Sequence, residues 1–297
     1  MTTIRTTIRA LAALLLAGAA AAPALAATPV PSGKWSFVYT DAKGHPDRPV
    51  RVFTYRPRQC DTKCPILIAL HGKGRAASAM RDYWELPADR HGFLVIAPEF
   101  SEKHWPKAAL YNLGGVDGES DPRKWTYSVI ERLFDEMRDG QADYRLFGHS
   151  AGAQFAHRMH LLLPDHRASV VVAANAGWYL MPEWRGDKAQ AKFPYSMVDA
   201  PVAGEAAVRR ALGRKLVVMV GANDTDPQHA DLDRSDGAMK QGATRVDRGE
   251  AFFAAASGAT RDLGMAGAWE LHLVEGAAHE SSKMVRAAAD RLFGKGK

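Results

Sequence analysis

The sequence contains only two cysteines in 297 residues, too few for a disulfide-built scaffold or a thiolate metal cluster. It has no G-x-G-x-x-G fingerprint and no P-loop, and the glycines at 114, 115 and 118 fit neither pattern. No dense basic run accompanies the formal net charge of +6, which disfavours nucleic acid as a partner. If the protein is an enzyme, we therefore expect its own side chains, and not a bound nucleotide or a thiolate metal cluster, to perform the reaction.

An acidic cluster is the only hint of a metal site. Asp231, Asp233 and Asp236 lie close together, but the turn glycine and terminal glutamate of an EF-hand are missing. A solvated loop explains these carboxylates more simply. We expect a protein that uses neither a metal nor a cofactor.

No apolar stretch reaches the roughly 20 residues that a membrane span requires. The apolar run from Ala10 to Ala22 follows two arginines and precedes the tripeptide Ala24-Leu25-Ala26. A positive start, a short apolar segment and an A-x-A site are typical of a secretory signal peptide. We expect residues 1–26 to be removed, leaving 27–297 as a single domain of a secreted or periplasmic protein.

The two cysteines, Cys60 and Cys64, lie close together just before an apolar run. An oxidising compartment favours a disulfide between them. Their spacing is one residue longer than the C-x-x-C of redox proteins. We therefore expect a structural disulfide across a small loop.

Short apolar runs alternate with helical patterns along most of the chain, which predicts an α/β fold with helices on both faces of a mostly parallel sheet. An antiparallel strand pair is expected first, at Lys34–Thr40 and Val50–Arg56. The expected buried strands are Ile66–Leu70, Phe93–Ala97, Arg145–Phe147, Val170–Ala174, Leu216–Val220 and Trp269–Val274. The expected helices are Lys124–Arg138, Ala153–Leu163, Glu250–Ala256 and Ser281–Phe293. The aperiodic segment 178–213 is expected to form an insertion or a small cap over the sheet edge.

The motif Gly148-His149-Ser150-Ala151-Gly152 lies between an expected strand and an expected helix. In that context G-x-S-x-G predicts a nucleophile elbow, in which a sharp turn holds the serine hydroxyl above the sheet. The turn brings neighbouring backbone so close that both outer positions must be glycine. Ser150 is therefore the candidate nucleophile.

A nucleophilic serine needs a base, and the base needs an acid that orients it. In this fold the order along the chain is serine, acid, histidine. Asp224 follows the strand 216–220 and is the preferred acid, with Asp226 as its rival. His279 lies between the last strand and the last helix, where the base belongs, whereas His272 is within a strand and His229 precedes another helix.

Stabilisation of a tetrahedral oxyanion needs two N–H donors. One is expected from the backbone of Ala151, the residue after the nucleophile. The other is expected from Lys73, because the strand 66–70 runs directly into His71-Gly72-Lys73.

Ligands of open α/β sheets bind at the carboxyl ends of the strands. Side chains that leave the expected strands at that edge are therefore candidate substrate contacts. They are His71, Trp105, Trp178 and Tyr179. The alternative for the aromatic rings is that they only pack the cap onto the sheet.

From about Val50 to Phe293 the chain resembles the α/β-hydrolase superfamily. Three features are similar to secreted esterases such as polyhydroxybutyrate depolymerases and feruloyl esterases. They are His71-Gly72 after a strand, the Gly148–Gly152 elbow, and His279 followed by Met284. Two positions differ, because members of that group often carry cysteine where Lys73 stands and a Gly-Met type continuation where Ala153-Gln154 stands.

This resemblance implies Ser150 as nucleophile, Asp224 as acid and His279 as base, with oxyanion donors from Lys73 and Ala151. The implied function is a cofactor-free serine hydrolase that cleaves small or oligomeric carboxylic esters through an acyl-enzyme. A serine peptidase or a lactone hydrolase on the same fold is the alternative enzyme. A non-catalytic envelope-binding protein is the alternative outside catalysis, and the intact Ser, Asp, His order favours the enzyme.

Overall fold

The computed structural model describes residues 30–163, 165–188 and 191–294. The expected signal peptide, residues 1–26, lies outside the described residues. Within them, no helix is both long enough and apolar enough to cross a membrane.

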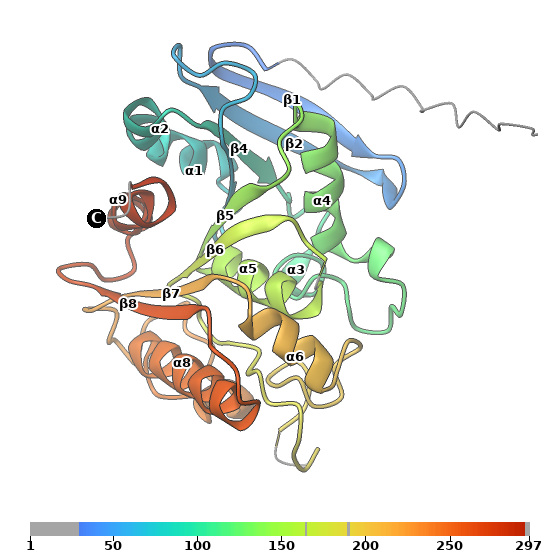
Figure 1. The fold of residues 1–297 in the computed structure, drawn as a ribbon, viewed down its shortest axis with the longest axis vertical. Coiled ribbons are helices and arrows are strands. Elements are labelled where there is room, and N and C mark those ends of the chain that lie inside the picture. Colours follow the sequence, from blue (N-terminus) through green and yellow to red (C-terminus); the bar gives the residue numbers. More distant parts are fainter. Residues whose placement is uncertain (1–29, 164, 189–190, 295–297) are drawn as a thin grey trace, which may run out of the picture.

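An eight-stranded sheet runs through the molecule in the order β1-β2-β4-β3-β5-β6-β7-β8 (Figure 1). Its strands are β1 (Gly33–Asp41), β2 (His45–Arg56), β3 (Ile66–Leu70), β4 (Leu94–Glu99), β5 (Tyr144–His149), β6 (Ala168–Ala174), β7 (Leu216–Gly221) and β8 (Trp269–Val274). β1 and β2 pair antiparallel, β2 is antiparallel to β4, and all later neighbours are parallel. The predicted mostly parallel sheet is confirmed.

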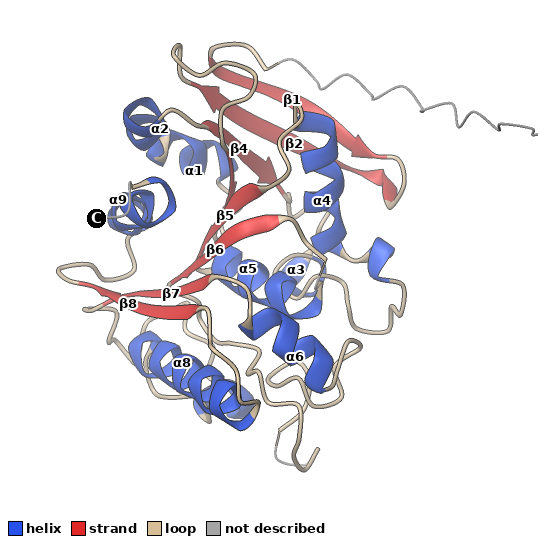
Figure 2. Cartoon of the chain, in the orientation of Figure 1, coloured by secondary structure: helices blue, strands red, loops and turns tan. Residues whose placement is uncertain are grey.

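Helices cover both faces of this sheet, as predicted (Figure 2). One face packs against α1 (Ala77–Tyr83), α2 (Glu85–His91) and α9 (Ser281–Phe293). The other packs against α4 (Thr126–Met137), α5 (Ala151–Leu162), α6 (Glu205–Leu212) and α8 (Arg245–Asp262). The short helices α3 (Lys107–Leu110), η1 (Pro122–Lys124) and α7 (Asp236–Met239) lie in connecting segments.

Strand β3 shows why its sequence is apolar without interruption. Ile66, Ile68 and Leu70 face the core on the α4 and α5 side. Leu67 and Ala69 face the core on the α1 and α9 side. All five residues are buried because a strand alternates its side chains between two covered faces.

Several element boundaries differ from the sequence-based expectation. β2 begins at His45 and not at Val50, because the polar residues before Val50 still pair with β1 through Asp41↔His45. α8 begins at Arg245 and not at Glu250, after a capping box in which Thr244 and Asp247 exchange side-chain hydrogen bonds with the helix start. The helices α1 and α2 were not predicted, since each spans only seven residues.

The segment 178–213 contains the expected irregular insertion. Its described part has one isolated bridge, Met181↔Ser196, before α6 completes it. Leu180 and Met197 of this segment are fully buried in the core that also holds α5 and α8. The predicted disulfide between Cys60 and Cys64 is also present, in the loop before β3.

Trp84, at the junction of α1 and α2, tests the packing of the α1 side. Its ring is fully buried and meets Phe93 and Phe147 edge-on, at centroid separations of 6.0 and 5.0 Å. Trp84→Ala is expected to lower the free energy of unfolding by about 3–5 kcal/mol, measured by urea denaturation. Leu86→Ala is the control, because Leu86 is 80% exposed and its loss should change stability by about 0.5 kcal/mol or less. Equal midpoints for the two variants would contradict this packing.

Candidate active site

The turn between β5 and α5 has the geometry predicted for a nucleophile elbow. Ser150 has φ 57° and ψ −116°, a positive-φ conformation that non-glycine residues rarely adopt. The backbone N–H of Ser150 donates to the carbonyl oxygen of Ala174 at 2.9 Å, and the backbone carbonyl oxygen of Ser150 accepts from the backbone N–H of Gln154 at 3.1 Å. These two backbone bonds hold the serine at the start of the helix.

Both glycines of the motif are required by close backbone contacts. A Cβ on Gly148 would lie 2.1 Å from the oxygen of Gly152. A Cβ on Gly152 would lie 2.5 Å from the oxygen of Leu70, at the end of β3. The elbow therefore packs directly against the strand that leads into His71-Gly72-Lys73.

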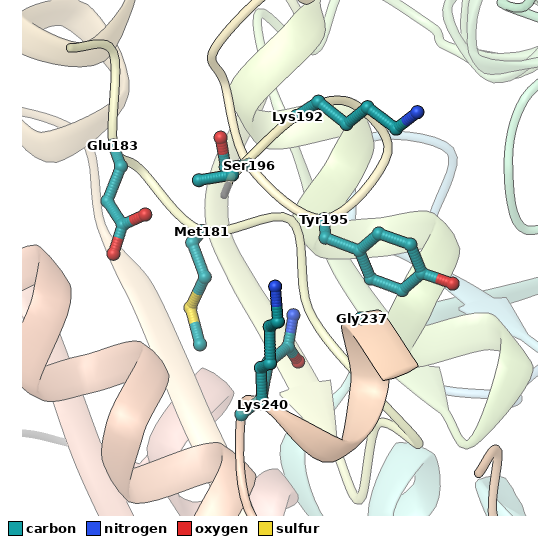
Figure 3. Close-up of a pocket in the computed structure, with 9 residues that line it drawn as sticks. Met181, Glu183, Lys192, Tyr195, Ser196, Gly237 and Lys240 are labelled. Atoms are coloured by element: carbon teal, nitrogen blue, oxygen red, sulfur yellow. The ribbon is translucent and has the colours of Figure 1, made fainter. Parts of the chain in front are cut away.

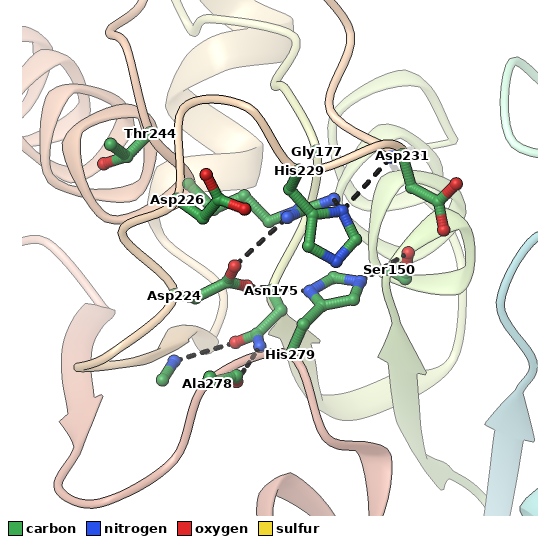
Figure 4. A network of polar contacts seen from close by, with 12 residues as sticks. Ser150, Asn175, Gly177, Asp224, Asp226, His229, Asp231, Thr244, Ala278 and His279 are labelled. Atoms are coloured by element: carbon green, nitrogen blue, oxygen red, sulfur yellow. Dashed lines mark hydrogen bonds and ion pairs between the residues drawn. The ribbon is translucent and has the colours of Figure 1, made fainter.

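The three candidate triad residues come together from different loops (Figure 4). Ser150 Oγ lies 3.1 Å from Nε2 of His279. Nδ1 of the same ring lies 2.7 Å from Oδ2 of Asp224. The rival acid, Asp226, is exposed and accepts instead from the amide of Gln228 at 2.8 Å. Of the two candidates, the structure brings Asp224 to the histidine.

Asp224 is almost completely buried, with its side chain 3% exposed. Burial alone would raise the pKa of this carboxyl, but the hydrogen bond and charge of His279 and the ion pair with Arg245 outweigh it and lower the pKa. Arg245 Nη1 lies 3.1 Å from Oδ1, and its side chain is 1% exposed. Asp224 therefore stays a carboxylate, with one oxygen for each partner.

Sequence reasoning missed Arg245, because the helix that carries it was expected to begin five residues later. The capping box at Thr244 was the readable signal, since it places Arg245 in the first turn of α8. Nothing in the sequence alone indicates that this arginine pairs with Asp224.

Asn175, directly after β6, joins the loops that carry the acid and the histidine. Its Nδ2 donates to the oxygen of Ala278 at 2.6 Å, and its Oδ1 accepts from the amide of Gly221 at 2.8 Å. It is fully buried and has φ 53°. Asn175 thus fixes the residue before His279 relative to the end of β7, another contact that sequence reasoning did not identify.

Two further histidines flank His279. His149 lies with its ring centroid 4.8 Å from that of His279 and shares a hydrogen bond with Ser281 Oγ at 3.0 Å. Burial lowers the pKa of His149 to about 3, so its ring is neutral. His229 lies in the loop between β7 and α7, and its ring centroid is 5.3 Å from that of His279.

The loop after β3 approaches the serine closely. A Cβ on Gly72 would lie 3.6 Å from Cβ of Ser150. The Lys73 side chain forms an ion pair with Asp231 of the loop after β7. Within the described residues, the amides of Lys73 and Ala151 have no hydrogen-bond acceptor.

The candidate substrate contacts are more buried than their loop positions suggest. His71, Trp105 and Tyr179 are fully or almost fully buried. His71 uses both ring nitrogens within the protein: Nδ1 contacts the oxygen of Gly72 at 2.8 Å, and Nε2 accepts from the amide of Phe100 at 3.1 Å. Burial lowers the pKa of His71 to about 4. His71 and Trp105 pack against the ring of Phe100, and Tyr179 packs against the ring of Phe252.

Trp178 is 6% exposed and lies in an aromatic and cationic stack. The Arg158 guanidinium lies 4.0 Å from its ring centroid, and the ring of Tyr195 lies 4.6 Å away. Tyr195 also lines a separate pocket of about 280 Å³ between the segment 178–213 and α7 (Figure 3). Other lining residues are Met181, Glu183, Lys192, Ser196 and Gln241.

No group of three or more His, Cys, Asp or Glu side chains in the described part of the chain could hold a metal ion. The aspartates considered above as a metal site have other contacts. Asp231 pairs with Lys73, and Asp233 accepts from the amide of Ser235 at 2.8 Å.

The close contact at the elbow predicts a strong effect of one methyl group. Gly148→Ala should lower the free energy of unfolding by about 3 kcal/mol, because its Cβ has no room beside the backbone of Gly152. Gly258→Ala in α8 is the matched control, since its Cβ would meet nothing closer than 3.9 Å. That variant should gain about 0.5–1 kcal/mol from helix propensity. Thermal denaturation of both proteins checks the prediction, and a neutral Gly148→Ala would contradict the contact.

Comparison with known proteins gives relatives among solved structures only; neither a family model nor a curated protein matches the sequence. Poly(aspartic acid) hydrolase-1 from Sphingomonas sp. KT-1 is 34% identical, with a TM-score of 0.80 over 89% of this chain and 100% of that one. LpqC, a poly(3-hydroxybutyrate) depolymerase from Bordetella parapertussis, is 31% identical, with a TM-score of 0.80 over 88% of this chain and 89% of that one.

A more distant structure shares the fold alone. FphF, a fluorophosphonate-binding serine hydrolase of Staphylococcus aureus, is 12% identical, with a TM-score of 0.52 over 89% of this chain and 98% of that one. Each of the two nearer relatives is more than 30% identical to this chain over most of both chains. The eight-stranded, mostly parallel sheet leads to the same family assignment. This chain belongs to the α/β-hydrolase superfamily.

Proposed function

We propose that this protein is a serine hydrolase that cleaves carboxylic esters through an acyl-enzyme on Ser150. The observation that carries the proposal is the continuous hydrogen-bonded chain from Ser150 Oγ through His279 to the buried carboxylate of Asp224. The resemblance to LpqC, named a poly(3-hydroxybutyrate) depolymerase, supports an ester as the substrate.

In this mechanism His279 is the general base. Asp224 accepts from Nδ1–H, which leaves Nε2 free to take the proton of the Ser150 hydroxyl as its oxygen attacks the ester carbonyl. The same nitrogen then gives that proton to the leaving alcohol. Water, activated by the same histidine, releases the acyl group from Ser150 in the second half of the reaction.

The negative charge of the tetrahedral intermediate needs donors that are already in place. The amides of Ala151 and Lys73 are the proposed pair, because both loops meet at Ser150 and neither amide has an acceptor among the described residues. Two such donors typically contribute about 3 kcal/mol each to the lowering of the barrier. The amino end of α5 adds a favourable dipole at the same point.

Hydrolysis of an amide is the second candidate. One of the two nearer relatives is named a poly(aspartic acid) hydrolase, and a polymer of an amino acid is joined by amide bonds. The proposed acyl-enzyme chemistry is the same for both bonds, so the substrate panel must decide. Purified protein assayed on p-nitrophenyl esters, a polyester film, poly(aspartic acid) and a peptide separates the candidates, and activity on none of them would contradict both.

We also propose that the protein is exported and acts outside the cytoplasm as a single domain covering residues 27–297. The A-x-A site after the apolar N-terminal segment supports this, and the Cys60–Cys64 disulfide is compatible with it. Sizing the mature protein by mass spectrometry after expression in a secreting host tests the cleavage after Ala26.

Ser150→Ala tests the nucleophile. Because the serine and its base act as a unit, turnover should fall by about 10⁶-fold, and the folded protein should no longer react with a fluorophosphonate probe. Among the described residues, the Ser150 hydroxyl forms no hydrogen bond other than that with His279, so the thermal midpoint should stay near that of the unmodified protein. Residual labelling of the variant would contradict the assignment.

The choice of acid is tested by paired amide substitutions. Asp224→Asn should reduce kcat by about 10⁴-fold, because the amide no longer holds the productive tautomer of His279. Asp226→Asn should reduce it by no more than about twofold, since this exposed side chain only caps the turn at Gln228. The opposite ranking in kcat would show that the resting hydrogen bond misidentifies the acid.

A further inference from the structure

His229 lies beside the reacting pair and has no role in the mechanism above. It is carried by the loop between β7 and α7, and its ring centroid lies 5.3 Å from that of His279, with an interplanar angle of 59°. Figure 4 shows this ring above His279, with the edge opposite Nδ1 turned toward His279 and Ser150. The loop thus places a second imidazole beside the proposed base, His279.

The hydrogen bonds of this ring fix which nitrogen carries the proton. Nδ1 of His229 accepts from the backbone amide of Asp231 at 3.1 Å. It also faces Nη2 of Arg245 at 3.4 Å, a longer contact. A backbone amide and a guanidinium can only donate, so Nδ1 is the acceptor and the proton of the neutral ring is on Nε2.

The same arginine holds His229 and the triad acid. Nη1 of Arg245 bonds Asp224, and Nη2 of the same guanidinium faces His229. On the other side, the Lys73–Asp231 ion pair ties the loop to the strand end that carries the proposed oxyanion donor. The position of His229 is therefore built into the network that positions Asp224.

The Nε2–H of His229 has no acceptor within the described residues. This N–H is turned toward His279 and Ser150 (Figure 4). In the proposed mechanism, His279 gives its proton to the departing oxygen of the leaving group. The proposed oxyanion donors are backbone N–H groups of other segments: Lys73 is in the loop after β3, and Ala151 is the first residue of α5. An N–H beside His279 is therefore placed to meet the leaving portion of the substrate.

We infer that His229 donates a hydrogen bond from Nε2 to an acceptor oxygen on the leaving group. The preferred substrates would then be esters whose leaving alcohol carries a second carbonyl near the scissile bond, as in an oligoester, over esters of simple alcohols. This inference rests on the proposed function and names the substrate class of that same site. Simple packing of the ring against His279 would need no N–H at that position.

Two butyrate esters separate these roles. One has methyl 3-hydroxybutyrate as its leaving alcohol, and the other has 2-hexanol, which has the same chain length but no second carbonyl. The quantity measured is the ratio of kcat/KM for the first ester to that for the second. Comparing this ratio between variants cancels the intrinsic reactivity of the two alcohols.

His229→Phe keeps an aromatic ring against His279 and removes the donor. The ratio is expected to fall about tenfold, the effect of one lost hydrogen bond to substrate. His229→Gln supplies a side-chain N–H near the same place and should restore the ratio to within about threefold of its original value. Gln228→Ala is the control from the same loop, because this side chain is exposed and forms no hydrogen bond with Asp224, His229 or His279. The backbone N–H of Gln228, which bonds Asp226, is kept in this variant, and its ratio should be unchanged.

Three results would overturn the inference. An unchanged ratio in His229→Phe would show that the ring only packs. Equal losses on both esters, together with slower fluorophosphonate labelling, would show that His229 acts through His279. Should the phenyl ring disturb the loop, His229→Ala removes the same donor, and an unchanged ratio in that folded variant counts equally against it.

Failure of the proposed function is recognised separately. If the unmodified protein hydrolyses neither ester and resists the fluorophosphonate probe, the serine esterase proposal itself is wrong. If it hydrolyses both esters and is labelled, but the variants leave the ratio unaltered, only the role of His229 is wrong.

Discussion

The arrangement depends on a contact between two stretches of backbone, where the elbow crosses the end of β3. Gly152 approaches the oxygens of Leu70 and His71 so closely that a Cβ would lie 2.5 and 2.7 Å from them. This approach sets Ser150 above the sheet and places Gly72 next to it. One steric requirement therefore positions the candidate nucleophile and both proposed oxyanion amides before any side chain is considered.

The second requirement is electrostatic, because a carboxylate as buried as Asp224 must be paired. Its two oxygens accept from different partners. Arg245 is at the start of α8, and His279 is in the loop between β8 and α9. Parallel strands end at the same edge of the sheet, so these distant segments meet there. Asn175 then bonds the acid loop and the histidine loop together.

Much of this arrangement could be predicted from the sequence, and the exceptions have physical reasons. β3 and β8 have the predicted bounds: β3 is an uninterrupted apolar run between Pro65 and His71, and β8 ends at the turn that begins with Glu275. The roles of Arg245 and Asn175 could not be predicted, because their bonds depend on how remote loops fold together. Trp105 and Tyr179 lie on the expected loops, yet their burial is decided by packing that no local pattern encodes.

The loop after β7 is held by two ion pairs of different kinds. Asp224–Arg245 at its base is buried, with side chains 3% and 1% exposed, so salt screens it little and losing one partner is costly. Lys73–Asp231 farther along is 66% and 36% exposed, and such pairs contribute about 0–1 kcal/mol and weaken with salt. The geometry of the proposed acid therefore does not depend on the outer pair. Asp231 also supplies the backbone N–H that fixes the tautomer of His229. The Lys73–Asp231 pair therefore influences the proposed substrate contact of His229, whereas the Asp224–Arg245 pair holds the proposed acid.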